Sequence, residues 1–420
     1  MSTKTCNVAA CVSGYAARLH AVIGDRHHVA SPLGAWLLLA LAGPASTGDD
    51  LVTLEEVLGC GVGSAADAAA GLLANPHPLV ASAAAVWTAD GGPLSDWFER
   101  WQDGLPPEVS RGPLPDQAGL DAWAREHTFG LIEKFPVRRT DGLYLVLATA
   151  LATKVSWQTP FELAPAAELG PGSSWSGLVS QVLRAPGPDG RPAPGHTQYI
   201  AGTQDAGDVA VHAALAQDGL LVVSVAADPA VPAGAVLAAA HEIARAQAVG
   251  GPVPRRSLAD LPLGPGPAWV LREERSSARR DACTAVLPAW RATSDHDLRN
   301  PVLGFQAAKN ALAPGGDPWQ ARQAAMASYT RYGFEAAAVT ALAVALAMTQ
   351  PSVHRVADLR FAHPYAVVAV TTDGNEAAPA AGAGRSQWHG LPVFSAWVAE
   401  PAEAADDSGD GQGASPGRPV

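Results

Sequence analysis

The side chains best placed for catalysis are His241 and Glu242, neighbours in an apolar segment predicted to be helical from 236 to 249. A zinc peptidase of the H-E-x-x-H type needs a second histidine one helical turn later, on the same face. Arg245 occupies that position, and a guanidinium stays protonated and does not ligate metal ions. The pair therefore predicts no metal centre.

The remaining reactive side chains show no pattern that would bring them together. We interpret the scattered histidines as hydrogen-bonded loop or core residues: His27, His28, His127, His196, His212 and His363. The cysteines have neither C-x-x-C spacing nor a paired framework, which indicates free buried thiols in a reducing compartment: Cys6, Cys11, Cys60 and Cys283. The sequence contains no phosphate-binding loop, dinucleotide-binding glycine motif or nucleophile elbow. We therefore predict no metal, no cofactor and no enzymatic activity.

Charge and hydropathy exclude two classes of partner. The net charge is −12, whereas nucleic-acid and anionic-membrane surfaces need clustered Lys and Arg. No long apolar run precedes Arg18, and the run from Trp36 to Leu41 is too short to span a bilayer. We expect a cytoplasmic monomer that binds neither nucleic acid nor membranes, and secretion by another route stays open.

Hydrophobic periodicity then indicates the elements that position these residues. Helical spacing predicts helices at 7–24, 32–42, 51–58 and 120–136, the second beginning at Ser31-Pro32 as N-cap and first turn. The run from Leu143 is continuously apolar, as a strand buried on both faces requires. Residues 208–229 are typical of a hairpin.

One stretch stands out by the size of its side chains. Tyr332 to Thr349 reads YGFEAAAVTALAVALAMT, in which small apolar residues follow a glycine and an acid. Small side chains suit a segment that inserts between two existing strands. The alternative is an ordinary buried helix from about Pro318 to Met348.

This stretch resembles the reactive-loop hinge of serpins, roughly E-E-G-T-E-A-A-A-A-T, through Gly333, Phe334, Glu335, Ala336, Ala337 and Ala338. Residues 143–162 resemble the serpin strand L-V-L-V-N-A-I-Y-F-K-G-x-W-x-x-P-F, with Lys154, Trp157, Pro160 and Phe161 in unbroken register. Weaker similarities follow in family order near Ser31-Pro32, Leu58-Gly59, Trp123 to Ile132, 219–229, 283–290, 360–370 and 393–401. The chain thus resembles a divergent, bacterial-type serpin.

The resemblance implies an α+β fold with three β-sheets, about eight or nine helices and an exposed C-terminal reactive loop. We expect one domain over residues 1–401. The polar, Gly-rich residues 402–420 are predicted to be a disordered tail.

The same resemblance implies a function. Serpins act as suicide substrates of serine proteases: the cut loop, here about residues 333–358, inserts into the central sheet and traps the acyl-enzyme. Counting from the hinge puts the cut bond near Ala347-Met348, and Leu346 is the alternative. Ala or Leu at the cut suits an elastase-like or subtilisin-like protease with a small, apolar pocket.

Several positions depart from the family pattern. Phe334 replaces a small residue at the first inserting position, and overpacking typically costs about 1–3 kcal/mol. Arg331-Tyr332 replaces two acids. The resemblance assigns the sheet-opening region to Ser31, Gly34, Thr149, Lys154, Trp157 and Gln323, where the polar cluster keeps only its first serine. The alternative is therefore a non-inhibitory binding or structural protein whose loop does not insert.

Overall fold

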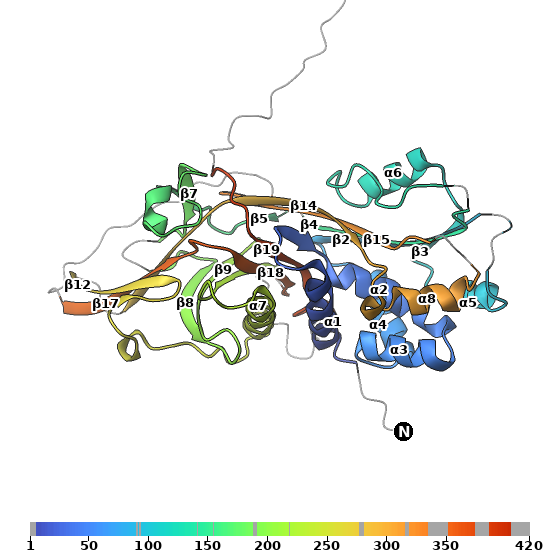
Figure 1. Cartoon of the computed structure of the whole chain (residues 1–420), viewed down its shortest axis with the longest axis horizontal. Coiled ribbons are helices and arrows are strands. Elements are labelled where there is room, and N and C mark those ends of the chain that lie inside the picture. The colour runs from blue at the N-terminus through green and yellow to red at the C-terminus, as the bar shows by residue number, and fades with distance from the viewer. Residues whose placement is uncertain are drawn as a thin grey trace, which may run out of the picture.

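The computed structural model describes residues 6–89, 91, 94–140, 142–153, 155–187, 191–217, 219–276, 281–315, 319–334, 352–373 and 386–404. Within them lie eight α-helices: α1 (Val8–Ile23), α2 (Pro32–Ala42), α3 (Gly48–Leu58), α4 (Val62–Ala74), α5 (Phe98–Asp103), α6 (Gln117–Glu126), α7 (Ala233–Ala248) and α8 (Phe305–Leu312). Helices α1 to α4 and α8 lie on one side of a long band of strands, and α6 lies on the other (Figure 1).

Helix α2 is the centre of the helical layer. The Ser31 side chain accepts a hydrogen bond from the backbone N–H of Gly34, and Pro32 occupies the first turn, as the sequence predicts. Trp36, Leu37 and Leu39 are almost fully buried, so the helix is apolar around its whole circumference. No single helix in the described part of the chain is long and apolar enough to cross a membrane; the bent α3–α4 pair alone has that length and composition.

The first sheet is antiparallel, in the order β1 (His28–Ala30), β19 (Pro392–Val398), β18 (Tyr365–Thr371), β10 (Leu220–Ala226), β9 (Asp208–Leu215) and β8 (His196–Gly202). One face of this sheet packs on α7, and the other contributes to the main core. Burial of both faces explains why β10, β18 and β19 are apolar almost without alternation. The predicted hairpin at 208–229 is the β9–β10 pair.

The second sheet runs in the order β11 (Gly264–Pro265), β12 (Trp269–Ser276), β17 (Ser352–Arg360), β13 (Ala282–Leu287), β7 (Gln181–Arg184) and β6 (Glu162–Pro165). Strand β17 pairs antiparallel with β12 and parallel with β13. Residues 352–358 therefore belong to the sheet, and the prediction that the loop extends to 358 is wrong. Strand pairing on both edges holds this segment, and the sequence pattern shows no boundary between it and the predicted reactive loop.

The remaining strands form the band, in two parts. One part is β3 (Val109–Pro113), β2 (Val80–Thr88) and β4 (Leu145–Thr153); the other is β14 (Trp290–Asp297) and β15 (Arg322–Tyr329). Two short strands, β5 (Val155–Ser156) and β16 (Gly333–Phe334), pair at the end of the band. Since residues 322–329 form β15 and residues 333–334 form β16, the alternative of one helix from 318 to 348 is wrong for the described residues.

Two predicted boundaries need correction. Helix α6 ends at Glu126, not Pro136, because Phe129 and Gly130 have positive φ and the Thr128 hydroxyl bonds both Ala124 O and the Ile132 N–H. Residues 402–404 are held in place, so the prediction of a disordered segment is wrong for these three: the Glu403 carboxylate accepts hydrogen bonds from Ser180 and from the Gln181 N–H.

Candidate functional site

The candidate site is the seam between β4 and β15, which lie in different parts of the band. Among the described strands, β4 pairs with β2 and β15 pairs with β14. Each of the two is therefore the edge strand of its own part of the band, and no strand pairing between described residues joins them. A cavity of about 50 Å³ lies between them, lined by residues 147–151 and 322–324. A second cavity of about 120 Å³ continues towards α8. The seam is therefore incompletely filled by the described residues.

The predicted hinge enters the top of this seam. Gly333 of β16 pairs antiparallel with Ser156 of β5, and Phe334 pairs with Val155. Between the end of β15 and Gly333 the chain turns back on itself. The Thr330 N–H and hydroxyl both donate to the Gly333 carbonyl across this turn, at 3.1 and 2.8 Å. The first hinge residues thus already run back alongside the extension of β4.

Gly333 is the residue that this reversal requires. Its φ of +149° is a conformation that side-chain-bearing residues rarely adopt. A Cβ atom there would also collide with the Val155 carbonyl oxygen and lie 2.8 Å from Ser156 Cα. Both the backbone angle and the close approach exclude a larger residue.

Trp157 fixes the turn from the side of β5. Its backbone N–H donates to Tyr332 O at 3.0 Å, and its indole Nε1–H donates to Thr330 O at 3.0 Å. The side chain is 1% exposed and lies against Phe161 and Tyr329. The hinge is therefore anchored on a rigid, buried aromatic cluster.

Arg331, one of the residues that replace the family's acids, takes part in the same anchor. The Phe161 N–H donates to Arg331 O at 2.9 Å, and Arg331 Nε donates to Phe161 O at 3.1 Å. These two bonds hold the chain immediately before the hinge onto the segment that follows Trp157.

The start of α2 bridges the two sides of the seam from below. The Gln323 side-chain amide on β15 accepts from the Ser31 N–H at 2.9 Å and donates to the Ser31 carbonyl at 2.8 Å. On the β4 side, the Thr149 hydroxyl donates to Gly34 O at 3.0 Å. The structure thus brings Ser31, Gly34, Thr149 and Gln323 together.

Packing explains why a glycine occupies position 34. A Cβ atom there would lie 3.1 Å from Leu151 Cδ1 and 3.3 Å from both the Ser31 and Thr149 hydroxyl oxygens. A serine, as in the family pattern, would crowd all three neighbours. The polar contacts with the start of α2 come from the Thr149 hydroxyl and the Gln323 amide.

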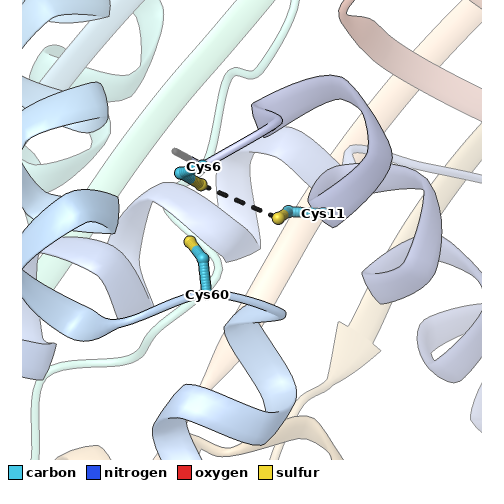
Figure 2. Close-up of side chains that lie close together, drawn as sticks. All are labelled: Cys6, Cys11 and Cys60. Carbon is cyan, nitrogen blue, oxygen red and sulfur yellow. Dashed lines mark hydrogen bonds between the residues drawn. The ribbon is translucent and has the colours of Figure 1, made fainter. Parts of the chain in front are cut away.

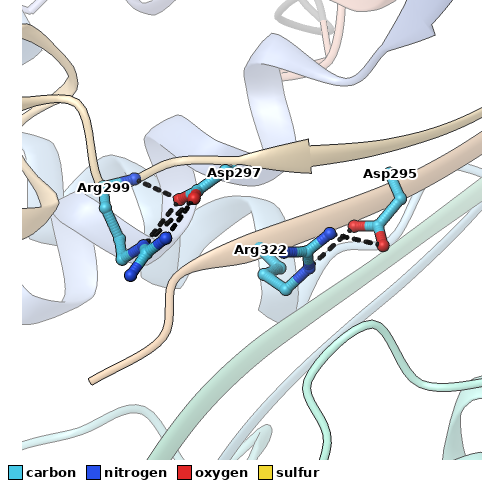
Figure 3. A network of polar contacts seen from close by, with 4 residues as sticks. All are labelled: Asp295, Asp297, Arg299 and Arg322. Carbon is cyan, nitrogen blue, oxygen red and sulfur yellow. Dashed lines mark hydrogen bonds and ion pairs between the residues drawn. The ribbon is translucent and has the colours of Figure 1, made fainter. Parts of the chain in front are cut away.

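Two Asp–Arg pairs lie near the edge shared by β14 and β15, one between the two strands and one at the end of β14 (Figure 3). Arg322 bonds both carboxylate oxygens of Asp295 on β14, at 3.0 and 2.7 Å, and Asp297 bonds Arg299. The Arg299 hydrogen bonds lower the pKa of Asp297 to about 2. All four side chains are partly exposed, so each pair contributes at most about 1 kcal/mol. The Asp295–Arg322 pair ties β15 to β14, and the Asp297–Arg299 pair is local to the end of β14.

Sequence reasoning missed a buried histidine chain. His28 Nδ1 lies 2.8 Å from Arg26 O, His28 Nε2 lies 2.8 Å from His20 Nδ1, and His20 Nε2 lies 2.6 Å from Ser395 Oγ. Because a carbonyl only accepts, each ring donates from Nδ1 and accepts at Nε2, with Ser395 as the last donor. Burial lowers the pKa of both imidazoles, which are therefore neutral at pH 7.

Other predicted site residues cannot be placed. Lys154, Glu335, Ala336, Ala337 and Ala338 lie outside the described residues, as do Leu346, Ala347 and Met348. The backbone of Phe334 is described, and its side chain is not. The roles assigned to these positions stay predictions.

Comparison with known proteins finds similar solved structures but no match by sequence. No family model matches the chain, and no curated protein does. The native structure of the thermophilic serpin tengpin is 11% identical over 95% of this chain and 96% of its own, with a TM-score of 0.64. Serpin48 of the insect Tenebrio molitor is 13% identical over 95% and 99%, with a TM-score of 0.59.

A further solved structure is human thyroxine-binding globulin complexed with its hormone. It is 12% identical over 94% of this chain and 99% of its own, with a TM-score of 0.60. Near-complete coverage of both chains matches the whole arrangement of sheets and helices, not a shared fragment. The α+β fold predicted from the sequence is confirmed: this chain has the serpin fold.

Proposed function

We propose that this chain inhibits serine-type endopeptidases as a suicide substrate, by inserting the segment that begins at Gly333 between β4 and β15. The observation that carries the proposal is the pairing of Gly333 and Phe334 with Ser156 and Val155. In the intact chain the backbone of these two residues therefore already lies along the extension of β4, on the edge where the proposed strand would enter.

The pairing also sets the register of the inserted strand. Continuing the same antiparallel register would place Thr340 opposite Thr149 and Val344 opposite Leu145. Leu145 is the first residue of β4, so insertion as far as Val344 would cover the whole strand. Residues 145–156 span about 40 Å at about 3.3 Å per residue, a displacement large enough to carry a bound protease along the sheet.

The seam supports entry of a strand. The described residues of β4 and β15 are joined through α2, not to each other, so no backbone ladder between them has to be broken. Residues of β4 that face the main core include Leu151, whereas Val146 and Ala148 face α6. Side chains paired with the core-facing set would be Ala336, Ala338, Thr340, Leu342 and Val344, most of them small.

The class of protease is inferred from the residues between β16 and β17, where the cut would fall. Strand β17 begins at Ser352, so a reactive loop would have to lie within residues 335–351. The protease serine would attack a carbonyl near Leu346, Ala347 or Met348, expel the new amine with the C-terminal fragment, and leave an acyl-enzyme ester. Insertion must then precede attack of water on that ester. Small, apolar residues at the cut favour an elastase-like or subtilisin-like protease.

The test is incubation of the full chain with a subtilisin-type protease, followed by a denaturing gel and a melting curve. We expect a band that contains both proteins and resists denaturation, and a cleaved form that melts at a higher temperature than the intact chain. Mass spectrometry of the released fragment locates the cut. Cleavage within 335–351 with no stable complex would refute inhibition. With no rise in melting temperature it would also refute insertion, and would leave the non-inhibitory alternative.

A further inference from the structure

We propose that Cys6, Cys11 and Cys60 form a three-thiolate site for a thiophilic metal ion such as Zn²⁺. Figure 2 shows the three side chains pointing towards one another from two separate parts of the chain. Their sulfur atoms all lie within 4.8 Å of one another, and all three are free thiols. The sites considered above do not use them.

The start of α1 holds two of the sulfurs. The Asn7 side chain caps the helix by accepting from the Ala10 N–H at 3.1 Å, which places Cys6 just before the cap and Cys11 in the first full turn. Residues in these two positions pack against each other at many helix starts. The Cys6 and Cys11 sulfurs accordingly lie 3.7 Å apart.

The third sulfur arrives from the end of α3. Gly59 has a φ of +75° and ends that helix, and the turn directs Cys60 back towards α1. A Cβ atom at position 59 would lie 3.4 Å from the Cys11 sulfur, so this backbone passes directly against α1. Ordinary packing at a helix start accounts for Cys6 and Cys11, but it does not require a third cysteine at this point.

The spacing fits a metal ion. With Zn–S bonds of about 2.3 Å, two sulfurs of a tetrahedral site lie about 3.8 Å apart. The Cys6–Cys11 separation of 3.7 Å already has this value. The largest separation, at most 4.8 Å, needs a contraction of about 1 Å, within the range of cysteine rotamers. Three protein ligands would leave a fourth position for solvent or an external ligand.

Metal binding at this site needs no change of oxidation state. A bound ion takes up three thiolates, releases their protons to solvent and forms three sulfur–metal bonds without an oxidant. All three residues are half-buried, so an ion can reach them.

The test uses the reduced full chain and Co²⁺, whose thiolate complexes absorb strongly in the near ultraviolet. We expect one equivalent of Co²⁺ to produce this absorption and one equivalent of Zn²⁺ to abolish it. The signal should be lost in Cys6→Ser, Cys11→Ser and Cys60→Ser. It should be unchanged in Cys283→Ser, a matched control at the fourth cysteine, on β13. No absorption in the parent, or full absorption in Cys60→Ser, would overturn the proposal.

A second measurement needs no variant. The parent chain is alkylated with and without Zn²⁺, and the modified cysteines are identified by mass spectrometry. Zinc should slow the labelling of Cys6, Cys11 and Cys60 together and leave Cys283 unaffected. Equal labelling of the three cysteines with and without Zn²⁺ would refute the site, even if a serine variant failed to fold.

Discussion

Replacing Thr340 by arginine tests whether the loop enters the seam in the register set by Gly333 and Phe334. In that register residue 340 lies opposite Thr149, at the middle of β4. Directly paired residues share one face of a sheet. The Thr149 side chain bonds Gly34 O on α2, so the new guanidinium would point into the packed layer beneath the seam.

The size of the effect follows from burial of an unpaired charge. Such a charge typically costs about 3–5 kcal/mol. Residue 340 must enter before the loop passes the middle of β4, so this cost falls on the barrier to insertion. Each 1.36 kcal/mol corresponds to about tenfold in rate, so insertion should slow by roughly 10²- to 10⁴-fold. Water would then hydrolyse the acyl-enzyme first.

The assay compares the parent, Thr340→Arg and the neutral control Thr340→Ala after incubation with a subtilisin-type protease. We expect the parent and Thr340→Ala to form a complex that resists denaturation, and Thr340→Arg to be cleaved without one. After cleavage, only the arginine variant should lack the rise in melting temperature. An arginine variant that traps protease as well as the parent would refute the proposed register.

Three further changes test the seam and its surroundings. Gln323→Ala removes both amide bonds to Ser31 and should lower the free energy of unfolding by about 1–3 kcal/mol; an unchanged urea midpoint would show that the bridge carries no stability. Gly333→Val should cost about 1–3 kcal/mol in backbone strain and remove the amide-exchange protection of Val155, and retained protection would contradict the close approach seen here. The pKa of His28 is lowered to about 4 by burial, below the value of about 6.5 expected in the unfolded chain. The unfolded state therefore binds the proton first, and stability is complete above about pH 6.5 and falls as the pH drops towards 4. His28→Gln should remove up to about 3 kcal/mol of that loss, and identical urea midpoints against pH in both proteins would argue against it.

Local signals in the sequence predicted most elements correctly. Ser31-Pro32 begins α2, and the apolar run from Leu143 contains β4, because caps and burial depend on neighbours in the chain. The errors lie where long-range contacts override local preference. Residues 352–358 are predicted from the sequence to continue the reactive loop but are held by strands on both sides. Glu403 has a tail-like composition but binds the backbone at Ser180.

The serpin-like order of segments can be read from the linear order of residues. So can the glycine and small residues of the predicted hinge, and the departures from the family pattern. Which polar groups meet depends on the packing of elements far apart in the chain. Ser31 and Gln323 are 292 residues apart and exchange two hydrogen bonds, and His20 reaches Ser395 across 375 residues. Cys60 joins Cys6 and Cys11 only because α3 ends against α1. Hydrophobic periodicity predicts which face of a helix or strand is buried. It does not predict which element packs on that face, because that depends on how all the elements pack together.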